Sequence, residues 1–303
     1  MSNHAEERVA LGASGLTVSA LGVGTNRWGA GGAARPGLQP VFAEALARGI
    51  TLFDTAEIYG RGGSERALGS LLATANPGPV VLSKFFPMPW RLRRPALLRA
   101  LRGSLERLGL PRVDVYLVHF PIPPVPIETW VGALAEAVHD GLARAVGVSN
   151  YSAAQMRRAH AVLAAHGVPL ACNEVEYSLL KRGPEKNSLL AACRELGVTL
   201  IAYRPLALGF LTAHAGADRT GIRGTAYGGR YARMISGLPG LLARIGTAHG
   251  GKTAPQVALN WLLCKGALPI PGATSASHLR ENAGALGWRL TPEEVSALDS
   301  AGG

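Results

Sequence analysis

The alternation of short apolar runs with longer amphipathic segments constrains the fold of this chain more than any other feature of its sequence. Runs rich in Val, Leu and Ile predict buried strands, and the segments between them have helical periodicity. The predicted strands are residues 20–24, 50–54, 79–84, 113–119, 145–149, 171–175, 199–203 and 267–271. The predicted helices are residues 39–47, 64–73, 94–108, 128–140, 153–165, 185–196 and 254–265. This pattern favours a (β/α)8 TIM barrel, in which helices surround eight parallel strands.

Glycines and a short N-terminal segment agree with this fold. Glycines that follow predicted helices within two residues, where a C′ residue turns the chain, are Gly49, Gly109, Gly141, Gly167 and Gly197. Residues 9–20 contain a Gly-punctuated turn at 13–16, which predicts a β-hairpin that closes the barrel floor. No repeat or shift in composition divides the chain, so we expect residues 1–303 to form a single domain. Residues 206–239 are Gly- and Arg-rich and too long for an ordinary connection, which favours a lid over a disordered loop.

The composition excludes several classes of protein. Charged residues interrupt every apolar run before the about 18 residues that a membrane span requires. Lys and Arg total 31 against 20 Asp and Glu, so the formal net charge of +11 raises the question of an anionic partner. Most of this excess is Arg spread along predicted helices, without clusters interleaved with aromatic residues. We therefore predict no nucleic-acid and no membrane partner.

The cysteines and the N-terminus bear on the cellular compartment. Cys172, Cys193 and Cys264 are odd in number and lack CxxC spacing, which predicts free thiols in a reducing compartment. The first residues, MSNHAEERVAL, contain no apolar signal core, so a cytoplasmic location is the default expectation. No HxH or HExxH spacing is found, and we predict no metal site.

Four reactive side chains fall at the carboxyl ends of neighbouring predicted strands, where the loops of a parallel barrel form one rim. Asp54 ends the second strand, Tyr59 lies five residues further on, Lys84 ends the third strand and His119 ends the fourth. Each residue alone has an ordinary explanation, such as capping, packing or a satisfied core histidine. Their convergence on one rim is what suggests catalysis.

Together the four residues suit proton transfer to a carbonyl oxygen. A phenol titrates near pH 10, and an adjacent ammonium such as that of Lys84 is expected to lower the pKa of Tyr59 toward the working range. Asp54 would hold and balance the lysine, and His119 would donate a hydrogen bond to the substrate oxygen.

The sequence resembles the aldo-keto reductase superfamily on these same residues. Residues 54–60 read DTAEIYG and are followed by Gly62, Ser64 and Glu65, which matches the DTAxxYGxGxSE signature of that family. Further matches cover nearly the whole chain: GVGT at 22–25, LSK at 82–84, an LGxxxVDxYxxHxP pattern at 108–121, GVSN at 147–150, NEVEY at 173–177 and PIPG at 269–272. The chain has no full GxGxxG fingerprint of a Rossmann fold.

The resemblance implies an NAD(P)H-dependent oxidoreductase of the class EC 1.1.1.- that reduces an aldehyde or ketone to an alcohol, or catalyses the reverse. The hydride would move directly from the nicotinamide, Tyr59 would be the general acid or base, and NADPH is preferred over NADH. The implied cofactor-binding residues are Gly24, Thr25, Ser149, Asn150, Glu174, Tyr203, Arg204, Pro205, Leu206, Gly272, Thr274, Ser275, His278 and Asn282. Trp28 and Phe85 adjoin the rim and are expected to wall the substrate pocket, while Trp130, Trp261 and Trp288 would pack helices.

Three departures from the family pattern leave alternatives open. Glu174 replaces the Gln that many members carry beside the nicotinamide amide, and its hydrogen-bond polarity differs. Arg204 either approaches the cofactor phosphates or pairs with Glu174 or Glu176. In the eighth-strand loop, hydroxyls and a helix N-terminus replace a family Lys as the binding site for the 2′-phosphate, with Arg280 in reach; alternatively, Ser277 only caps a helix.

The arginines of the 206–239 loop and the overall role of the protein each allow two interpretations. Arg219, Arg223, Arg230 and Arg233 either fold over the cofactor pyrophosphate or belong to a solvated loop. The four reactive residues also fit a cofactor-sensing regulatory subunit with little turnover, since some relatives of this barrel serve that role. The substrate, the reaction direction and the oligomeric state do not follow from the sequence.

Overall fold

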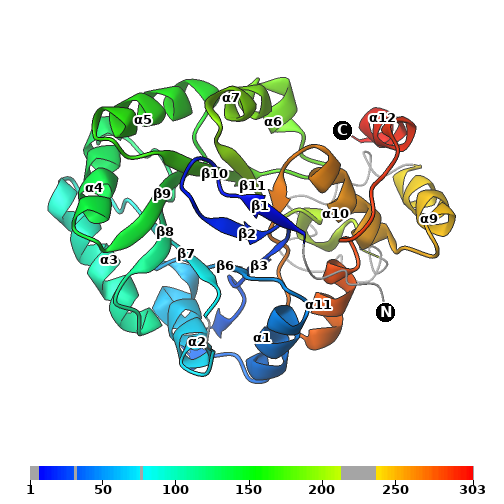
Figure 1. Cartoon of the computed structure of the whole chain (residues 1–303), viewed down its shortest axis with the longest axis horizontal. Helices are drawn as coiled ribbons and strands as arrows, with labels where there is room; N and C mark the ends of the chain where they lie inside the picture. Colours follow the sequence, from blue (N-terminus) through cyan, green and yellow to red (C-terminus); the bar gives the residue numbers. More distant parts are fainter. Residues whose placement is uncertain (1–6, 31–32, 76–77, 213–236, 303) are drawn as a thin grey trace.

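Eight parallel strands form a barrel surrounded by helices in the computed structural model, which describes residues 7–30, 33–75, 78–212 and 237–302 (Figure 1). The strands in chain order are β3 (Gly22–Gly24), β6 (Leu52–Asp54), β7 (Val80–Phe85), β8 (Val113–Val118), β9 (Ala143–Ser149), β10 (Leu170–Glu176), β11 (Thr199–Tyr203) and β12 (Leu268–Pro269). Each pairs in parallel with its neighbour in the chain, and a bridge between Gly24 and Gly272 joins the first strand to the segment that follows the last. The predicted TIM barrel is confirmed.

The helices agree with the predicted segments at most positions. They are α1 (Leu38–Ala47), α2 (Gly63–Leu72), α3 (Arg94–Leu108), α4 (Ile127–His139), α5 (Ala153–Ala165), α6 (Gly183–Lys186), α7 (Leu189–Leu196), α9 (Leu238–Ala248), α10 (Ala254–Cys264), α11 (Ala276–Ala283) and α12 (Pro292–Ala301). The single helix predicted at 185–196 is wrong, because Ser188 adopts a left-handed conformation (φ 61°) that separates α6 from α7.

Close backbone approach explains why small residues stand at the point of barrel closure. A Cβ on Gly24 would lie 3.0 Å from the backbone oxygen of Ile270, across the seam between β3 and the eighth strand. The five predicted C′ glycines all have positive φ, between 63° and 70°, as a left-handed helix end requires.

The barrel floor is closed by the predicted hairpin, which consists of β1 (Arg8–Ala10) and β2 (Thr17–Ser19) and lies across the end of the barrel that faces the viewer in Figure 1. Its Leu11 and Val18 side chains are fully buried against residues inside the barrel, such as Leu117. Thr199 at the start of β11 anchors the hairpin: its hydroxyl accepts from the Gly12 amide at 2.8 Å and donates to the Ala10 carbonyl at 3.2 Å.

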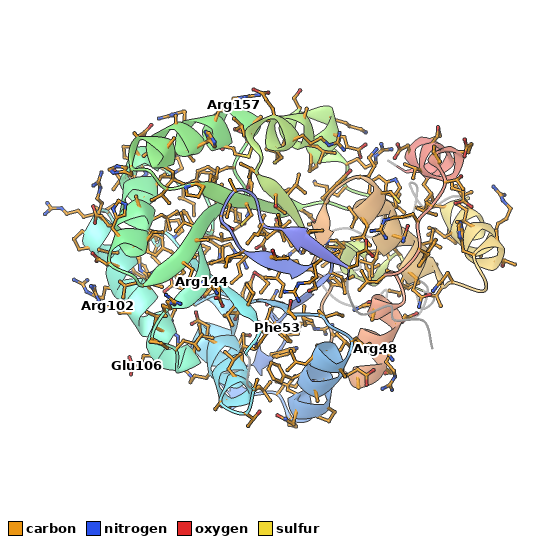
Figure 2. The ribbon with its side chains drawn as sticks, in the orientation of Figure 1. Arg48, Phe53, Arg102, Glu106, Arg144 and Arg157 are labelled. Carbon is orange, nitrogen blue, oxygen red and sulfur yellow. The ribbon has the colours of Figure 1, made fainter. Side chains whose placement is uncertain are left out.

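Side chains separate by polarity between the barrel and its surroundings. Figure 2 shows Arg102 and Arg157 directed outward from the helical ring, whereas Phe53 lies between the barrel and α1 and packs on Phe42. Several surface arginines pair with carboxylates; Arg157, for example, contacts Glu195. No helix among the described residues is long and apolar enough to cross a membrane. Most of the predicted lid, including its four arginines, lies outside the described residues.

Candidate active site

The structure brings the four predicted catalytic residues together at the carboxyl end of the barrel. Asp54 is the last residue of β6, Lys84 lies in β7, and His119 directly follows β8. Tyr59 begins the short 3₁₀ helix η1 (Tyr59–Gly62). Its hydroxyl lies 3.5 Å from Lys84 Nζ, and its ring meets the His119 ring edge-on with 5.8 Å between centroids.

Lys84 is the centre of this cluster and is completely buried. Its ammonium donates to Asp54 Oδ1 and to the Thr55 carbonyl, the latter at 3.0 Å. Glu174 Oε2 lies 3.3 Å from the same nitrogen. Burial alone lowers the pKa of Lys84, but the two carboxylates outweigh burial and raise it above its ordinary value, so the lysine stays charged.

A tightly packed glycine turn holds Tyr59 in place. Gly60 has φ 56°, and a Cβ there would lie 2.0 Å from the Gly29 backbone oxygen. Ser64 at the start of α2 accepts from the Gly29 amide and donates to the Thr25 carbonyl. The GxGxSE part of the signature therefore fits the Tyr59 turn onto the backbone around residues 25–29.

The predicted net direction of the Tyr59 pKa is wrong. Burial raises the pKa of Tyr59 above its ordinary value; Lys84 lowers it, as expected, but does not outweigh burial and the nearby carboxylates. Tyr59 is therefore protonated at neutral pH. A protonated phenol beside an ammonium can give its proton to an acceptor and leave a stabilised phenolate.

His119 is held neutral between aromatic side chains. Its ring stacks on Phe120 at a centroid distance of 5.0 Å and meets Phe86 edge-on at 5.7 Å. Burial and the neighbouring Lys84 charge lower the pKa of His119 to about 3. Nδ1 is buried and has no hydrogen-bond partner among the described residues. A neutral imidazole of this kind can orient a polar substrate atom without adding charge.

The predicted nicotinamide residues form one hydrogen-bond network beside the cluster. Ser149 Oγ donates to the Glu174 carbonyl at 2.9 Å, and Asn150 Nδ2 donates to Ser149 Oγ and to the His119 carbonyl at 3.0 Å each. The Tyr203 hydroxyl donates to Asn150 Oδ1 at 2.9 Å. Asn150 has a left-handed conformation (φ 62°) at the end of β9, and the network stabilises it.

Three predicted contacts require correction, because the side chains are completely buried. The Thr25 hydroxyl donates to the Asp54 carbonyl, so it joins two strand ends and is not presented to a cofactor. Trp28 donates to the Ala273 carbonyl within the core, and Phe85 packs on Trp130 at 4.8 Å between ring centroids. Neither aromatic ring walls an open pocket.

Phe86 and Phe120 are the aromatic residues that flank His119, and neither was predicted from the sequence. Side chains alternate along a strand, so the residue after Lys84 points away from the barrel and the next one returns toward the rim. This alternation could have predicted from the sequence that Phe86, two residues after Lys84, lies at the rim. Glu57 was not predicted either; it accepts from the Phe86 amide at 2.7 Å and pairs with Arg91, which lies in the same loop as Phe86.

Near the eighth strand, Ser275 rather than Ser277 caps a helix. Ser275 is the N-cap of α11, and its hydroxyl accepts from the His278 amide at 3.2 Å. His278 and Gly272 are exposed, Thr274 is half-buried and Asn282 is buried. Arg280 pairs with Glu44 of α1 at 3.1 Å, so it is engaged away from this N-terminus. Exposed groups around the start of α11 remain available for a phosphate.

Arg204, which follows β11, was expected either to approach the cofactor phosphates or to pair with a carboxylate of β10. Arg204 Nη1 lies 3.5 Å from Glu176 Oε1, which favours the ion pair over a phosphate contact. Pro205 is buried and Leu206 is half-buried beside the rim.

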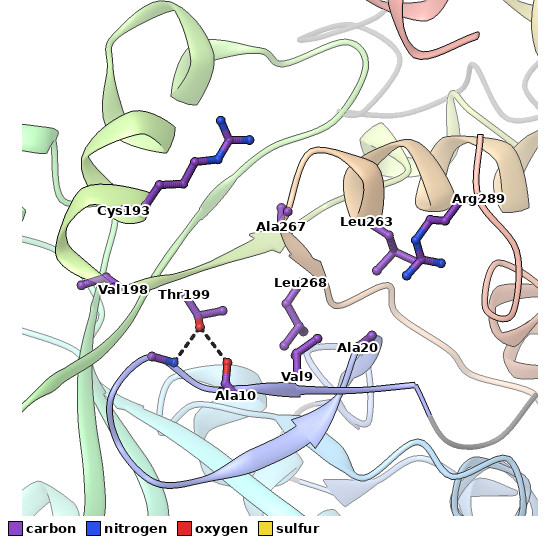
Figure 3. Close-up of a pocket in the computed structure, with 14 residues that line it drawn as sticks. Val9, Ala10, Ala20, Cys193, Val198, Thr199, Leu263, Ala267, Leu268 and Arg289 are labelled. Carbon is purple, nitrogen blue, oxygen red and sulfur yellow. Dashed lines mark hydrogen bonds between the residues drawn. The ribbon is translucent and has the colours of Figure 1, made fainter. Parts of the chain in front are cut away.

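A depression lies at the end of the barrel opposite the four reactive residues (Figure 3). It has a volume of about 360 Å³ and is lined by hairpin residues such as Val9 and by Thr199, Leu268 and Arg289. It contains none of the reactive residues described above and lies at the barrel floor, so the rim is the candidate active site.

A parallel barrel with Tyr, Lys, Asp and His converging at its carboxyl end defines an oxidoreductase of the aldo-keto reductase type. The model of the Aldo/keto reductase family matches residues 20–302, and the chain belongs to this family.

Curated relatives and solved structures agree with this assignment. The chain is 39% identical to the chloroplastic pyridoxal reductase of Arabidopsis thaliana, over 94% of this chain and 84% of that protein. It is 38% identical to an uncharacterised oxidoreductase of Mycobacterium tuberculosis, over 94% and 89% of the two chains. A thermostable aldo-keto reductase solved with the inhibitor epalrestat is 34% identical, with a TM-score of 0.80 over 97% of this chain and 99% of that one. The glycerol dehydrogenase of Gluconobacter oxydans has a TM-score of 0.85 at 25% identity, over 99% and 95%.

Proposed function

We propose that this protein reduces an aldehyde or ketone with NADPH, or catalyses the reverse oxidation, and that Tyr59 transfers the proton. The observation that carries the proposal is the position of the Tyr59 hydroxyl, 3.5 Å from a buried ammonium and beside a neutral imidazole at the catalytic end of the barrel. Family membership supports the reaction class. The name of the Arabidopsis relative makes pyridoxal a rational first aldehyde to test.

The residues at the rim fit a nicotinamide dinucleotide. Glu174 Oε2 is a buried polar atom without a hydrogen-bond partner among the described residues, in the region that would face a carboxamide. Ser149, Asn150, Glu174 and Tyr203 would hold the nicotinamide end, and Gly24, Pro205 and Leu206 would line its path. Gly272, Thr274, Ser275, His278 and Asn282 would surround the 2′-phosphate at the N-terminus of α11, which is the basis for preferring NADPH.

When bound, NADPH supplies the hydride that is added to the carbonyl carbon. Tyr59 donates its proton to the carbonyl oxygen in the same step, so the product is a neutral alcohol. Lys84 stabilises the phenolate that forms, and Asp54 keeps Lys84 in place. His119 orients the carbonyl oxygen, and Phe86 and Phe120 exclude water around it.

The test measures NADPH consumption with pyridoxal, nitrobenzaldehyde, methylglyoxal and simple ketones. For Tyr59→Phe we expect kcat to fall by about 10²–10⁴, because the proton donor is lost, while the Kd for NADPH stays nearly constant. Equal rates in the variant would remove Tyr59 from the proposed role. Tight NADPH binding without turnover of any carbonyl would favour a cofactor-sensing subunit instead. The cytoplasmic location stays a prediction.

A further inference from the structure

The buried cluster contains two carboxyl groups around one ammonium. Lys84 lies between Asp54 and Glu174, and all three side chains are buried. Asp54 makes the closer contact with Lys84, so it is the carboxylate that balances the Lys84 charge. Glu174 Oε2, at 3.3 Å, has no hydrogen-bond partner among the described residues. A second carboxylate here would give the cluster one excess negative charge in a region of low dielectric.

Glu174 is consequently the member of the cluster that gains or loses a proton near neutral pH. Burial and the Asp54 charge raise the pKa of Glu174 to about 8, against the lowering effect of Lys84. Burial also raises the pKa of Asp54, but its closer contact with Lys84 favours the charged form. Below this pH the Asp54–Lys84–Glu174 cluster is neutral, and above it the cluster carries one negative charge.

The groups around Glu174 do not titrate in the same range. Across the adjacent strands its partners are Ser149 on β9 and Ile201 on β11, which carry no charge. Tyr59 on η1 and Cys172 on β10 have pKa values raised by burial, Lys84 on β7 stays protonated, and the pKa of His119 after β8 is lowered to about 3. The Tyr203 hydroxyl on β11 is bonded to Asn150.

Glu174 also belongs to the backbone that supports the nicotinamide residues. Its carbonyl accepts from Ser149 Oγ and from the Asn150 amide, both at 2.9 Å. If Ser149 and Asn150 hold the carboxamide, as proposed above, the Glu174 side chain lies beside the nicotinamide ring. That ring is a cation in NADP⁺ and neutral in NADPH, so a negative charge at Glu174 favours the oxidised form.

We propose that Glu174 is a specificity-determining residue for the redox state of the cofactor: its ionisation shifts the binding preference of the site from NADPH toward NADP⁺ as the pH rises. This inference rests on the proposed function. The position that many relatives fill with an uncharged Gln thereby becomes a pH-dependent element in this chain, biasing it toward reduction at low pH and oxidation at high pH.

The test is calorimetric titration of the native protein with NADP⁺ and with NADPH at pH 6.5, 8 and 9.5. We expect the ratio of the NADPH Kd to the NADP⁺ Kd to rise roughly tenfold over this range. A tenfold rise corresponds to a Glu174 pKa that is about one unit lower in the NADP⁺ complex than in the NADPH complex. The 2′-phosphate is common to both ligands and cancels in the ratio. Glu174→Gln is expected to make the ratio nearly independent of pH.

Glu176→Gln is the matched control, because Glu176 lies two residues further along β10 and pairs with the exposed Arg204. It should keep the pH dependence of the native protein. A Glu174→Gln variant that keeps that dependence, or a native ratio that does not change with pH, overturns the inference. If neither nucleotide binds the native protein, the proposed function itself fails.

Should Glu174→Gln not fold, infrared titration of the native protein decides. A protonated carboxyl band that is present at pH 6.5 and lost by pH 9.5 supports the inference, and its absence at pH 6.5 overturns it.

Discussion

Lys84 can remain charged inside the barrel only because carboxyl groups surround it. Burying an unpaired ammonium is costly, and the Asp54 contact together with the Thr55 carbonyl offsets that cost. The same arrangement creates a cost at Glu174, since a second ionised carboxyl has no cation of its own. The stability of the folded protein therefore depends on the protonation state of Glu174.

The stability of the protein is expected to depend on pH through Glu174. The pKa of Glu174 is raised in the folded protein, so its contribution to stability is present below its unfolded pKa and is lost as the pH rises toward about 8. Glu174→Gln removes this loss. The free energy of unfolding of the variant, relative to the native protein, should therefore increase between pH 5 and pH 8 by up to about 1.4 kcal/mol per pH unit.

Urea unfolding of both proteins at pH 5, 6.5 and 8 measures this difference. Glu176→Gln again serves as the control, because its partner Arg204 lies at the exposed rim. A constant difference between native protein and Glu174→Gln across this range would show that Glu174 is ionised throughout.

At the scale of elements, the turn that carries Tyr59 depends on glycine contacts more than on side-chain packing. Gly60 combines a positive φ of 56° with a backbone neighbour where its Cβ would be, and η1 packs against the backbone of Gly29. A residue with a Cβ at position 60 must move the turn, and Tyr59 moves with it.

Gly60→Ala should therefore reduce both stability and activity. We expect a loss of more than about 2 kcal/mol in the free energy of unfolding, from conformational strain plus steric overlap, and a fall in kcat of at least about tenfold. Gly37→Ala is the control: Gly37 has φ 74° but no atom within 4 Å of its Cβ position, so only the strain of about 1–2 kcal/mol applies. Comparable losses in the two variants would contradict the role of the Gly29 contact.

The sequence allowed the eight strands and most helices to be predicted because each buries a periodic apolar face. Helix α9 was not predicted, since its Gly and Pro residues obscure the period of its buried positions Leu238, Leu242 and Ile245. The exposed turn between α6 and α7 carries Asn187 and Ser188, which favour turns less decisively than Gly or Pro, so the break was not predicted.

The reactive residues could be predicted because strand ends converge in a barrel, but their side-chain environment could not. Phe85 was predicted at the rim, but Phe86 lies there instead. Neighbouring residues of a strand point to opposite faces, so a difference of one residue decides which of the two reaches the rim. The contact of Glu174 with Lys84 joins β10 to β7 across the barrel interior, which no local pattern encodes. Net burial, which reverses the expected direction of the Tyr59 pKa, is likewise a property of the folded chain.

In the whole molecule, the reactive residues and the closure of the barrel lie at opposite ends. The carboxyl end holds the reactive residues, and the floor is closed by the β1–β2 hairpin, which Thr199 anchors through two hydrogen bonds (Figure 3). In barrels of this kind, residues at the floor contribute to stability and those at the rim to catalysis. Substitutions at the floor should therefore change stability without changing chemistry.

Thr199→Val tests this separation. The variant keeps the shape of the side chain but leaves the Gly12 amide without its partner, which should lower the free energy of unfolding by about 1–3 kcal/mol. We expect kcat/KM for the aldehyde panel to stay within about twofold of the native value. Thr247→Val is the control, since Thr247 is exposed on α9 and its hydroxyl donates to the Ala243 carbonyl of the same helix. Unfolding curves and steady-state rates of the three proteins give both quantities. A large fall in kcat/KM for a folded Thr199→Val would show that the floor and the rim are coupled through the strands.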